Sequence, residues 1–188
     1  VQSGSNRILK AMNRPYTRES YLRIVEALRK ASPDIHLSTD AIVGFPGETE
    51  EEFALTESLF EEVGFDMAFI FKYSIRTGTK AATMVEQTPR EVKEARNQAL
   101  LRILERHSLR RNESLAGTTQ EVLVEGPARK GEGMFAGRTR GFRKVVFPGS
   151  ERMVGGLVEV AVEEASVTTL RGTPVLTELA SDEIVSVA

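Results

Sequence analysis

The chain has 188 residues, of which 28% are charged, 40% hydrophobic and 6% aromatic, and its formal net charge is −2. This composition is typical of a soluble globular protein with one large domain or two small ones, and it excludes a disordered chain. No apolar stretch approaches the roughly 20 residues that a transmembrane helix needs, and no signal-peptide pattern opens the chain. We therefore expect a cytoplasmic protein without a membrane segment.

Cysteine is absent, and histidine occurs only at His36 and His107. The sequence thus excludes disulfides, a cysteine nucleophile and thiolate-held zinc or iron–sulfur sites within these residues. Two histidines are too few for a histidine-rich metal site, and we expect both to be structural or surface residues. The segment Val1–Ser5 has the pattern of a strand end with its ligand loop, and no methionine precedes it. We expect the chain to be cut from a longer protein.

The first 116 residues predict an α/β domain, because strand and helix patterns alternate along them. Thr17 can cap a helix whose apolar residues have helical spacing, and Pro33 ends it. Thr49 and Glu52 form a capping box for a second helix, which Gly64 ends as a C-cap.

Two strands and a third helix complete the expected first domain. The strands span residues 35–43 and 67–73, and the second is apolar enough to be buried on both faces. Thr88, followed by Pro, Arg and Glu, starts a helix that continues to Ala116. Its apolar stripe gives one buried face, and its many Arg and Glu residues predict a solvated remainder.

After Gly117 short β-type runs alternate with glycines. Five short strands within about 60 residues predict a small closed barrel of the oligonucleotide-binding kind. We place the domain boundary at this glycine, so that residues 1–116 form the first domain, 117–180 the second and 181–188 a tail. The strands are expected over residues 119–124, 134–139, 144–147, 157–162 and 167–170.

The segment Ser38–Thr49 predicts a ligand loop, since an apolar strand stops at a Gly-Pro-Gly turn and a helix follows directly. In α/β proteins such loops bind ligands, and the carboxyl ends of parallel strands share one rim. Polar residues also follow the other strand patterns, at Gln2–Ser3 and Tyr73–Thr79, so we expect one pocket at this rim. Glu48 is interpreted as part of the first helical turn, where negative charge is favoured.

The candidate residues of this pocket allow more than one role. Gln2 and Ser3 offer amide and hydroxyl groups suited to ribose hydroxyls or an amino-acid head group. Arg14 and Arg76 can hold a carboxylate or a phosphate, although each is as consistent with a surface salt bridge. Asp40 is either catalytic or a structural acceptor for loop N–H groups.

Positive charge is concentrated between Arg129 and Arg152, where seven basic and two acidic residues give a net charge of +5. Basic side chains interleaved with phenylalanines on a small barrel suit a polyanion with stackable bases. RNA fits better than duplex DNA, because no helix is available to enter a major groove. The alternative is a solvated hairpin with core phenylalanines. The expected RNA-binding residues are Arg129, Lys130, Arg138, Arg140, Arg143 and Lys144, and the phenylalanines are Phe135, Phe142 and Phe147.

Six segments carry a family resemblance. Four are Val-Gln-Ser-Gly-Ser (1–5), Met-Asn-Arg-x-Tyr-Thr (12–17), Ser-Thr-Asp-x-Ile-Val-Gly-Phe-Pro-Gly-Glu-Thr (38–49) and Phe-Lys-Tyr-Ser-x-Arg-x-Gly-Thr-x-Ala (71–81). They resemble the radical-SAM methylthiotransferases, with the MiaB-type tRNA enzymes as the closest group. Gly-Arg-Thr-Arg-Gly-Phe-Arg-Lys-Val-Val-Phe (137–147) and Leu-Arg-Gly (170–172) are similar to the TRAM domain that ends those proteins.

The resemblance implies a fold, cofactors and a reaction. The fold would be α/β: the C-terminal half of an open (β/α)6 radical-SAM barrel, followed by a small all-β, OB-like TRAM barrel. Family members cleave S-adenosylmethionine with an iron–sulfur cluster held by a Cys-x-x-x-Cys-x-x-Cys loop, and an N-terminal domain binds a second cluster. They attach a methylthio group to C2 of isopentenyl-adenosine at position 37, beside the tRNA anticodon, with an electron donor such as flavodoxin.

The resemblance also assigns residues. Tyr73–Arg76 would lie near adenine or substrate, and Arg14 would pair with the carboxylate of S-adenosylmethionine. Because the cluster-binding cysteines lie upstream in the family, we expect no catalytic or metal-binding residue here and no activity from these 188 residues alone. The expected cofactor-binding residues are Gln2, Ser3, Arg14, Asp40, Val43, Gly44, Phe45, Tyr73 and Arg76.

Two other functions stay open. A sister family modifies an aspartate of a ribosomal protein with the same core, and a non-enzymatic RNA-binding module could reuse a half barrel as a scaffold. The Arg-rich stretch 137–147 favours tRNA, with the anticodon stem-loop as the expected partner. Exposed strand edges of a half barrel make dimerisation a further expectation.

Overall fold

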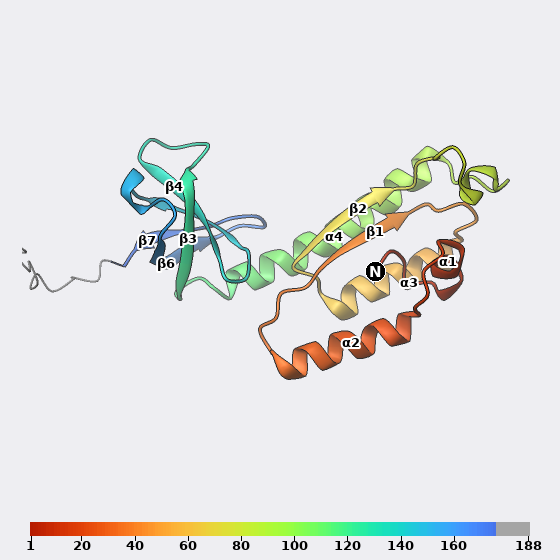
Figure 1. Ribbon diagram of the computed structural model, residues 1–188, viewed down its shortest axis with the longest axis horizontal. Helices are drawn as coiled ribbons and strands as arrows, with labels where there is room; N and C mark the ends of the chain where they lie inside the picture. Colours follow the sequence, from red (N-terminus) through yellow and green to blue (C-terminus); the bar gives the residue numbers. More distant parts are fainter. Residues whose placement is uncertain (176–188) are drawn as a thin grey trace, which may run out of the picture. The chain divides into compact units, whose positions relative to one another are not determined.

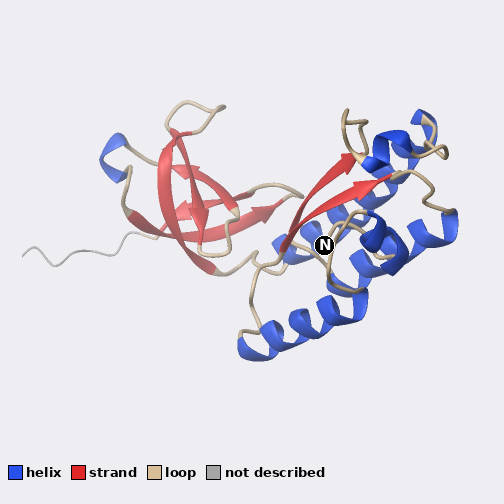
Figure 2. Ribbon diagram, turned by 45° about the vertical axis from the view of Figure 1, so that its right-hand side comes forward, coloured by secondary structure: helices blue, strands red, loops and turns tan. Residues whose placement is uncertain are grey.

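The computed structural model describes residues 1–175, which form two compact units (Figures 1 and 2). Unit 1 is Val1–Arg111, unit 2 begins at Asn112, and each is described here by itself. The division lies in the last turn of a long helix, slightly before the boundary expected at Gly117. The expected tail, residues 181–188, lies outside the described residues, as do residues 176–180.

Unit 1 contains a two-stranded parallel sheet and the helices that cover one of its faces (Figure 1). The strands pair in register, with Ser38 opposite Met67 and Val43 opposite Lys72. Helix α3 connects them, as a parallel pair requires. In chain order the elements are α1 (Asn6–Ala11), α2 (Arg18–Ala31), β1 (Ser38–Val43), α3 (Glu50–Val63), β2 (Met67–Lys72), the 3-10 helix η1 (Lys80–Thr83) and α4 (Arg90–Glu113).

The helix termini of unit 1 follow the capping rules that the sequence suggests. The Thr17 hydroxyl accepts a hydrogen bond from the Ser20 N–H and starts α2. Thr49 and Glu52 form the expected capping box of α3, and Gly64 ends that helix with a φ of 54°. Helix α4 begins at Arg90 and is slightly shorter at both ends than expected.

The sheet of unit 1 is buried on one face only. Ala41 and Val43 of β1 are fully buried, and they pack with Phe60 and Leu100 of helices α3 and α4. The outward residues of β2 are exposed, with Met67, Phe69 and Phe71 at 41%, 54% and 53%. The expectation that this strand is buried on both faces is therefore wrong within residues 1–175.

The expected strand at the start of the chain is not formed either. Residues 1–4 run beside β1, where the Gln2 carbonyl accepts a hydrogen bond of 2.9 Å from the Ile42 N–H. Within residues 1–175 unit 1 therefore contributes two paired strands, and the expected half barrel is not directly visible. No helix in the described part of the chain is long and apolar enough to cross a membrane.

Unit 2 is a closed five-stranded barrel, as the sequence predicts. The strand order is β3-β4-β5-β7-β6; β5 and β7 pair parallel, and the other pairs are antiparallel. Gly172 permits the close approach of β7 and β6, because a Cβ there would lie 1.9 Å from the Ala161 carbonyl oxygen. The elements are β3 (Thr119–Pro127), β4 (Met134–Thr139), β5 (Lys144–Pro148), the 3-10 helix η2 (Glu151–Met153), β6 (Leu157–Ala165) and β7 (Leu170–Pro174).

The barrel of unit 2 has its own hydrophobic core. Every second residue of β3, β4 and β5 points inward, so Val122, Val124, Phe135 and Phe147 are at most 5% exposed. The basic residues of these strands consequently alternate with the core and lie on the outside, with the exception described below.

Candidate functional site

The loop behind β1 is held by its own backbone and by its neighbours. Gly44 and Gly47 have φ values of 70° and 74°, which favour glycine. The Gly44 N–H donates to Glu48 Oε2 at 2.7 Å, and the Gly47 N–H donates to the Glu86 carbonyl at 2.8 Å. A Cβ on Gly44 would lie 2.2 Å from Cγ of Lys93. The missing side chain of Gly44 therefore accommodates Lys93.

Glu48 forms a buried ion pair with Arg96 of α4. Their side chains are 1% and 7% exposed, and Arg96 Nη1 donates to Glu48 Oε2 at 2.8 Å. Arg96 also donates to Glu50 at 3.0 Å and lies over the ring of Phe53. Burial raises the pKa of the Glu48 carboxyl, although the Gly44 N–H and Arg96 oppose this.

Glu48 does not have the position that the sequence reading gave it. The helix starts at Glu50 with Thr49 as its N-cap, so Glu48 precedes the helix and turns inward. Arg96 was missed as a partner, although a signal existed: it follows Val92 by one helical turn on the apolar side of α4. A lone arginine on an apolar helix stripe often indicates a buried carboxylate partner.

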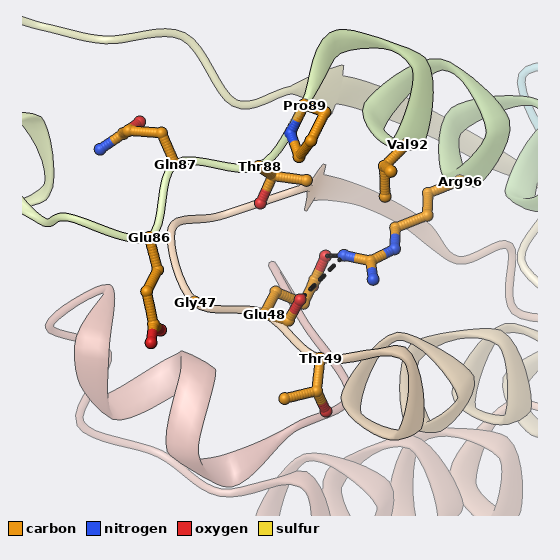
Figure 3. A pocket seen from close by; sticks show the side chains of 9 residues that line it. All are labelled: Gly47, Glu48, Thr49, Glu86, Gln87, Thr88, Pro89, Val92 and Arg96. Carbon is orange, nitrogen blue, oxygen red and sulfur yellow. Dashed lines mark hydrogen bonds and ion pairs between the residues drawn. The ribbon is translucent and has the colours of Figure 1, made fainter.

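Next to this ion pair lies a pocket of about 370 Å³ between residues 47–49 and 86–96 (Figure 3). Two buried atoms of its lining, Glu48 Oε1 and Arg96 Nε, have no hydrogen-bond partner among residues 1–175. None of the expected cofactor-binding residues lines it. The lining residues are Gly47, Glu48, Thr49, Glu86, Gln87, Thr88, Pro89, Val92 and Arg96.

The carboxyl ends of β1 and β2 meet, as the shared rim predicts. The Val43 carbonyl accepts a hydrogen bond of 2.9 Å from the Tyr73 N–H, and the rings of Phe45 and Tyr73 are 5.3 Å apart. Lys93 Nζ donates to the Tyr73 carbonyl at 3.1 Å. The Tyr73 hydroxyl is buried without a hydrogen-bond partner in the described part of the chain, so it is a polar group that a ligand could satisfy.

Gln2 and Ser3, the polar residues expected at the start of the rim, both have hydrogen-bond partners within unit 1. Gln2 is half-buried, and its side-chain oxygen accepts the Tyr16 hydroxyl. Ser3 is fully buried, and its hydroxyl contacts Thr56 Oγ1 and the Ser5 N–H. The ligand-binding role of Ser3 stays a prediction, although its hydroxyl already supports the segment leading into α1.

Arg14, Asp40 and Arg76 are exposed. Asp40 lies on the open face of the sheet, opposite Phe69 in the register. Arg76 lies in the loop after β2, where its carbonyl accepts a hydrogen bond from Thr79.

The two histidines have structural partners. His36 Nδ1 lies 3.3 Å from Asp66 Oδ1, and His107 Nε2 lies 3.0 Å from Glu61 Oε2. Burial works against ionisation of Asp66, but hydrogen bonds from His36 and the Leu37 N–H, with the charge of Arg111, lower its pKa overall. These contacts support the structural interpretation of both rings.

The expected RNA-binding residues are mostly on the surface of unit 2. Arg129 and Lys130 are exposed between β3 and β4. Arg138 pairs with Glu125 at 3.4 Å, and Arg140 pairs with Glu121 at 3.0 Å. Lys144 is partly exposed at the start of β5.

Arg143 is the exception among these basic residues. It is 8% exposed, because it faces the interior in the β4–β5 turn and its N–H donates to Thr139 Oγ1. The RNA-binding role of Arg143 stays a prediction, and little of this residue is accessible to a ligand. Of the three phenylalanines, Phe135 and Phe147 are core residues as in the alternative reading, and only Phe142 is exposed, at 65%.

Of the two expected cofactors, the side chains present suit S-adenosylmethionine and do not suit an iron–sulfur cluster. An exposed guanidinium, an exposed carboxylate and the unpartnered Tyr73 hydroxyl fit the carboxylate, hydroxyl and amine groups of S-adenosylmethionine. An iron–sulfur cluster does not fit, since the chain has no cysteine and residues 1–175 contain no cluster of metal-binding side chains.

The α/β unit carries a ligand loop, and the five-stranded barrel carries a cluster of basic side chains between residues 129 and 152. Comparison with known proteins shows which families the two units resemble. Residues 1–60 match the Radical SAM superfamily, and residues 113–175 match the TRAM domain. These are the two families that the motifs of the chain predict, in the same order along the sequence.

The relatives are tRNA-2-methylthio-N(6)-dimethylallyladenosine synthases. That of Opitutus terrae is 56% identical over 92% of this chain and 36% of its own length. Those of Akkermansia muciniphila and Desulfitobacterium hafniense are 48% and 47% identical, over 93% and 91% of this chain and 38% of their own lengths. The chain thus spans somewhat more than a third of these relatives.

Proposed function

We propose that the chain is the C-terminal part of a tRNA methylthiotransferase that adds a methylthio group to C2 of isopentenyl-adenosine at position 37. The observation that carries this proposal is the occurrence of a radical SAM segment and a TRAM domain in one chain, 56% identical to a relative of that name. A cysteine-free polypeptide cannot hold the clusters of the family, so these residues alone would be inactive.

Unit 1 would bind S-adenosylmethionine at the carboxyl ends of β1 and β2. Arg14 would pair with its carboxylate, Asp40 would accept from its hydroxyl or amino groups, and Tyr73 would donate its free hydroxyl. S-adenosylmethionine would supply the methyl group and the radical chemistry in the complete enzyme. An electron donor such as flavodoxin would act on that enzyme as well.

Unit 2 would bind the anticodon stem-loop through its exposed cations. Arg129, Lys130, Arg138, Arg140 and Lys144 are all accessible, and such a cluster of cations suits the phosphates of an RNA stem. The second candidate is the modification of a ribosomal-protein aspartate. The names of the relatives and the basic residues between 129 and 152 favour tRNA.

Binding measurements with the 188-residue chain test this proposal. A labelled anticodon stem-loop is titrated at 50 and 200 mM salt, beside a peptide from the aspartate-bearing loop of a ribosomal protein. We expect RNA binding that weakens by about tenfold or more across this salt range, as several phosphate contacts require. Tight, salt-insensitive binding of the peptide alone would favour the sister function.

Calorimetric titration with S-adenosylmethionine tests the ligand site separately. Arg14→Ala and Asp40→Ala should weaken binding, while Glu26→Ala on the exposed side of α2 serves as a control that leaves it unchanged. Equal binding by all variants would remove Arg14 and Asp40 from the site. Size-exclusion chromatography with light scattering would test dimerisation through the edges of β1 and β2.

A further inference from the structure

The turn between β4 and β5 of unit 2 has an unusual conformation. Thr139 and Arg143 close it, with the Thr139 N–H donating to the Arg143 carbonyl at 3.0 Å, so three residues form the loop. The last of them, Phe142, has a φ of 62°. In three-residue hairpin loops the residue with this conformation is usually glycine.

Phe142 gains nothing from burial that would offset this conformation. A left-handed backbone is strained for a residue with a Cβ, and an aromatic side chain exposed to water is unfavourable as well. Phe142 combines both features, since it is 65% exposed. Strained residues that are also exposed are found most often at binding sites.

The neighbouring strand holds the ring in place from one side. The Arg138 guanidinium lies 4.7 Å from the centroid of the Phe142 ring, and its Nη1 donates to the Phe142 carbonyl at 3.2 Å. Glu125 Oε1 forms an ion pair with Nε of the same guanidinium at 3.4 Å. A planar cation stacked on a phenyl ring and anchored twice gives a preorganised platform.

Three basic side chains surround this platform, together with Glu125 and Glu121, which pair with Arg138 and Arg140. Lys144 lies opposite Arg138 in the β4–β5 register, and side chains at paired positions share a face of the sheet. Arg140 extends from the same turn and is 89% exposed. Cations beside an exposed aromatic ring are the combination that single-stranded nucleic-acid sites use for phosphates and bases.

We infer that Phe142 is a stacking platform for one unpaired base of a bound RNA, with Arg138 behind the ring and Lys144 near the phosphates. This inference rests on the proposed RNA-binding function and goes beyond it, because it assigns recognition of an unpaired nucleotide to one residue. It predicts that the protein distinguishes a stem-loop from a continuous duplex.

The test uses the 188-residue chain and an RNA stem-loop of seven unpaired nucleotides with 2-aminopurine in the loop. Phe142→Gly removes the ring and relieves the backbone, so loss of binding cannot come from a destabilised turn. We expect a 5- to 100-fold weaker affinity, the usual range for one lost base–aromatic stack, with an unchanged salt dependence. The quenching of 2-aminopurine on binding should also disappear.

Two further variants separate stacking from general contact. Phe142→Tyr keeps the ring and should bind within about twofold of the wild type. Leu157→Ala, at a site that is 64% exposed on β6, is the matched control and should also bind normally. A fully paired RNA of equal length should bind the wild type and Phe142→Gly equally.

The outcomes distinguish the inference from the function on which it rests. If the wild type does not bind the stem-loop, the proposed RNA-binding function fails and the inference fails with it. If the wild type binds and Phe142→Gly binds equally well, or if Leu157→Ala loses as much affinity, RNA binding stands and the stacking role of Phe142 is overturned.

Discussion

The strands of the two units bury their apolar residues to different extents. In unit 2 five strands close on themselves, and Phe147 of β5 is completely buried. In unit 1 only two strands pair, and Phe69 of β2 is 54% exposed although its strand is as apolar. Whether a phenylalanine belongs to the core therefore depends more on the number of strands and on the closure of the sheet than on the composition of its strand.

For charged residues the difference in burial is reversed, because unit 1 contains the buried ion pair. In unit 2 the ion pairs of Arg138 with Glu125 and of Arg140 with Glu121 lie at the surface of the barrel. Unit 1 buries the pair of Glu48 and Arg96 beneath its ligand loop. Buried pairs are sensitive to the loss of one partner, whereas surface pairs contribute little. In unit 1 a buried ion pair therefore holds the ligand loop in place. In unit 2 the paired cations Arg138 and Arg140 stay at the surface.

The largest expected effect on stability distinguishes the buried Phe147 from the exposed Phe69. Phe147→Ala should destabilise unit 2 by about 3–5 kcal/mol, since it leaves a cavity in a small core. Phe69→Ala should change the free energy of unfolding by less than about 0.5 kcal/mol. Denaturant unfolding followed by circular dichroism measures both. Similar losses from the two substitutions would mean that β2 is covered in solution, for instance by a second copy of the chain.

The next effect concerns the buried ion pair. Glu48→Gln keeps an acceptor for the Gly44 N–H but leaves Arg96 with one carboxylate fewer, so unit 1 should lose about 1–3 kcal/mol. Glu50→Gln is the matched control, because Glu50 is the exposed partner of the same arginine, and it should cost less than about 1 kcal/mol. If Glu50→Gln proved the more damaging change, the burial of Glu48 would not explain the fixed loop.

Acid should act in opposite directions on Glu48 and Asp66. The folded pKa of Asp66 is lowered, so its contribution is complete above its ordinary pKa of 3.8 and is lost as the pH falls through the folded value. The folded pKa of Glu48 is raised, so the folded state takes up a proton first and stability gains as the pH falls toward 4.5.

Two variants test these opposite dependences of stability on pH. The stability difference between wild type and Asp66→Asn, of about 1–3 kcal/mol at neutral pH, should shrink below pH 4. The difference between wild type and Glu48→Gln should instead grow between neutral pH and pH 4.5. Urea titrations at several pH values measure both differences. Parallel slopes would contradict the assigned environments of the two carboxyl groups.

The sequence predicted those parts of the fold that depend on interactions between residues close together in the chain. The capping residues Thr17, Thr49 and Gly64 act within one helical turn, so their local pattern identified the helix ends. The five-strand barrel was also predictable, because short strands separated by glycines have few other ways to bury one face.

The errors came from contacts between residues far apart in the sequence. The partners of Ser3 and Glu48 are Thr56 and Arg96, and the place of Arg96 on an apolar helix stripe suggests a buried carboxylate without identifying Glu48. Arg143 was assigned to RNA binding as one of a cluster of basic residues, but it is only 8% exposed, and its N–H donates to Thr139 Oγ1 within the β4–β5 turn. Its RNA-binding role stays a prediction.

The smallest expected effect on stability tests the accessible cations. Arg140→Ala removes an exposed ion pair with Glu121 and should change the free energy of unfolding by less than about 0.5 kcal/mol. Its effect on RNA binding should be visible nonetheless, because one phosphate contact changes the slope of log affinity against log salt by about 1. Glu121→Gln is the control, since it breaks the same ion pair but keeps the cation. Equal salt slopes for wild type and Arg140→Ala would show that Arg140 does not face the RNA, and the basic surface would then narrow to Arg138, Lys144 and the loop before β4.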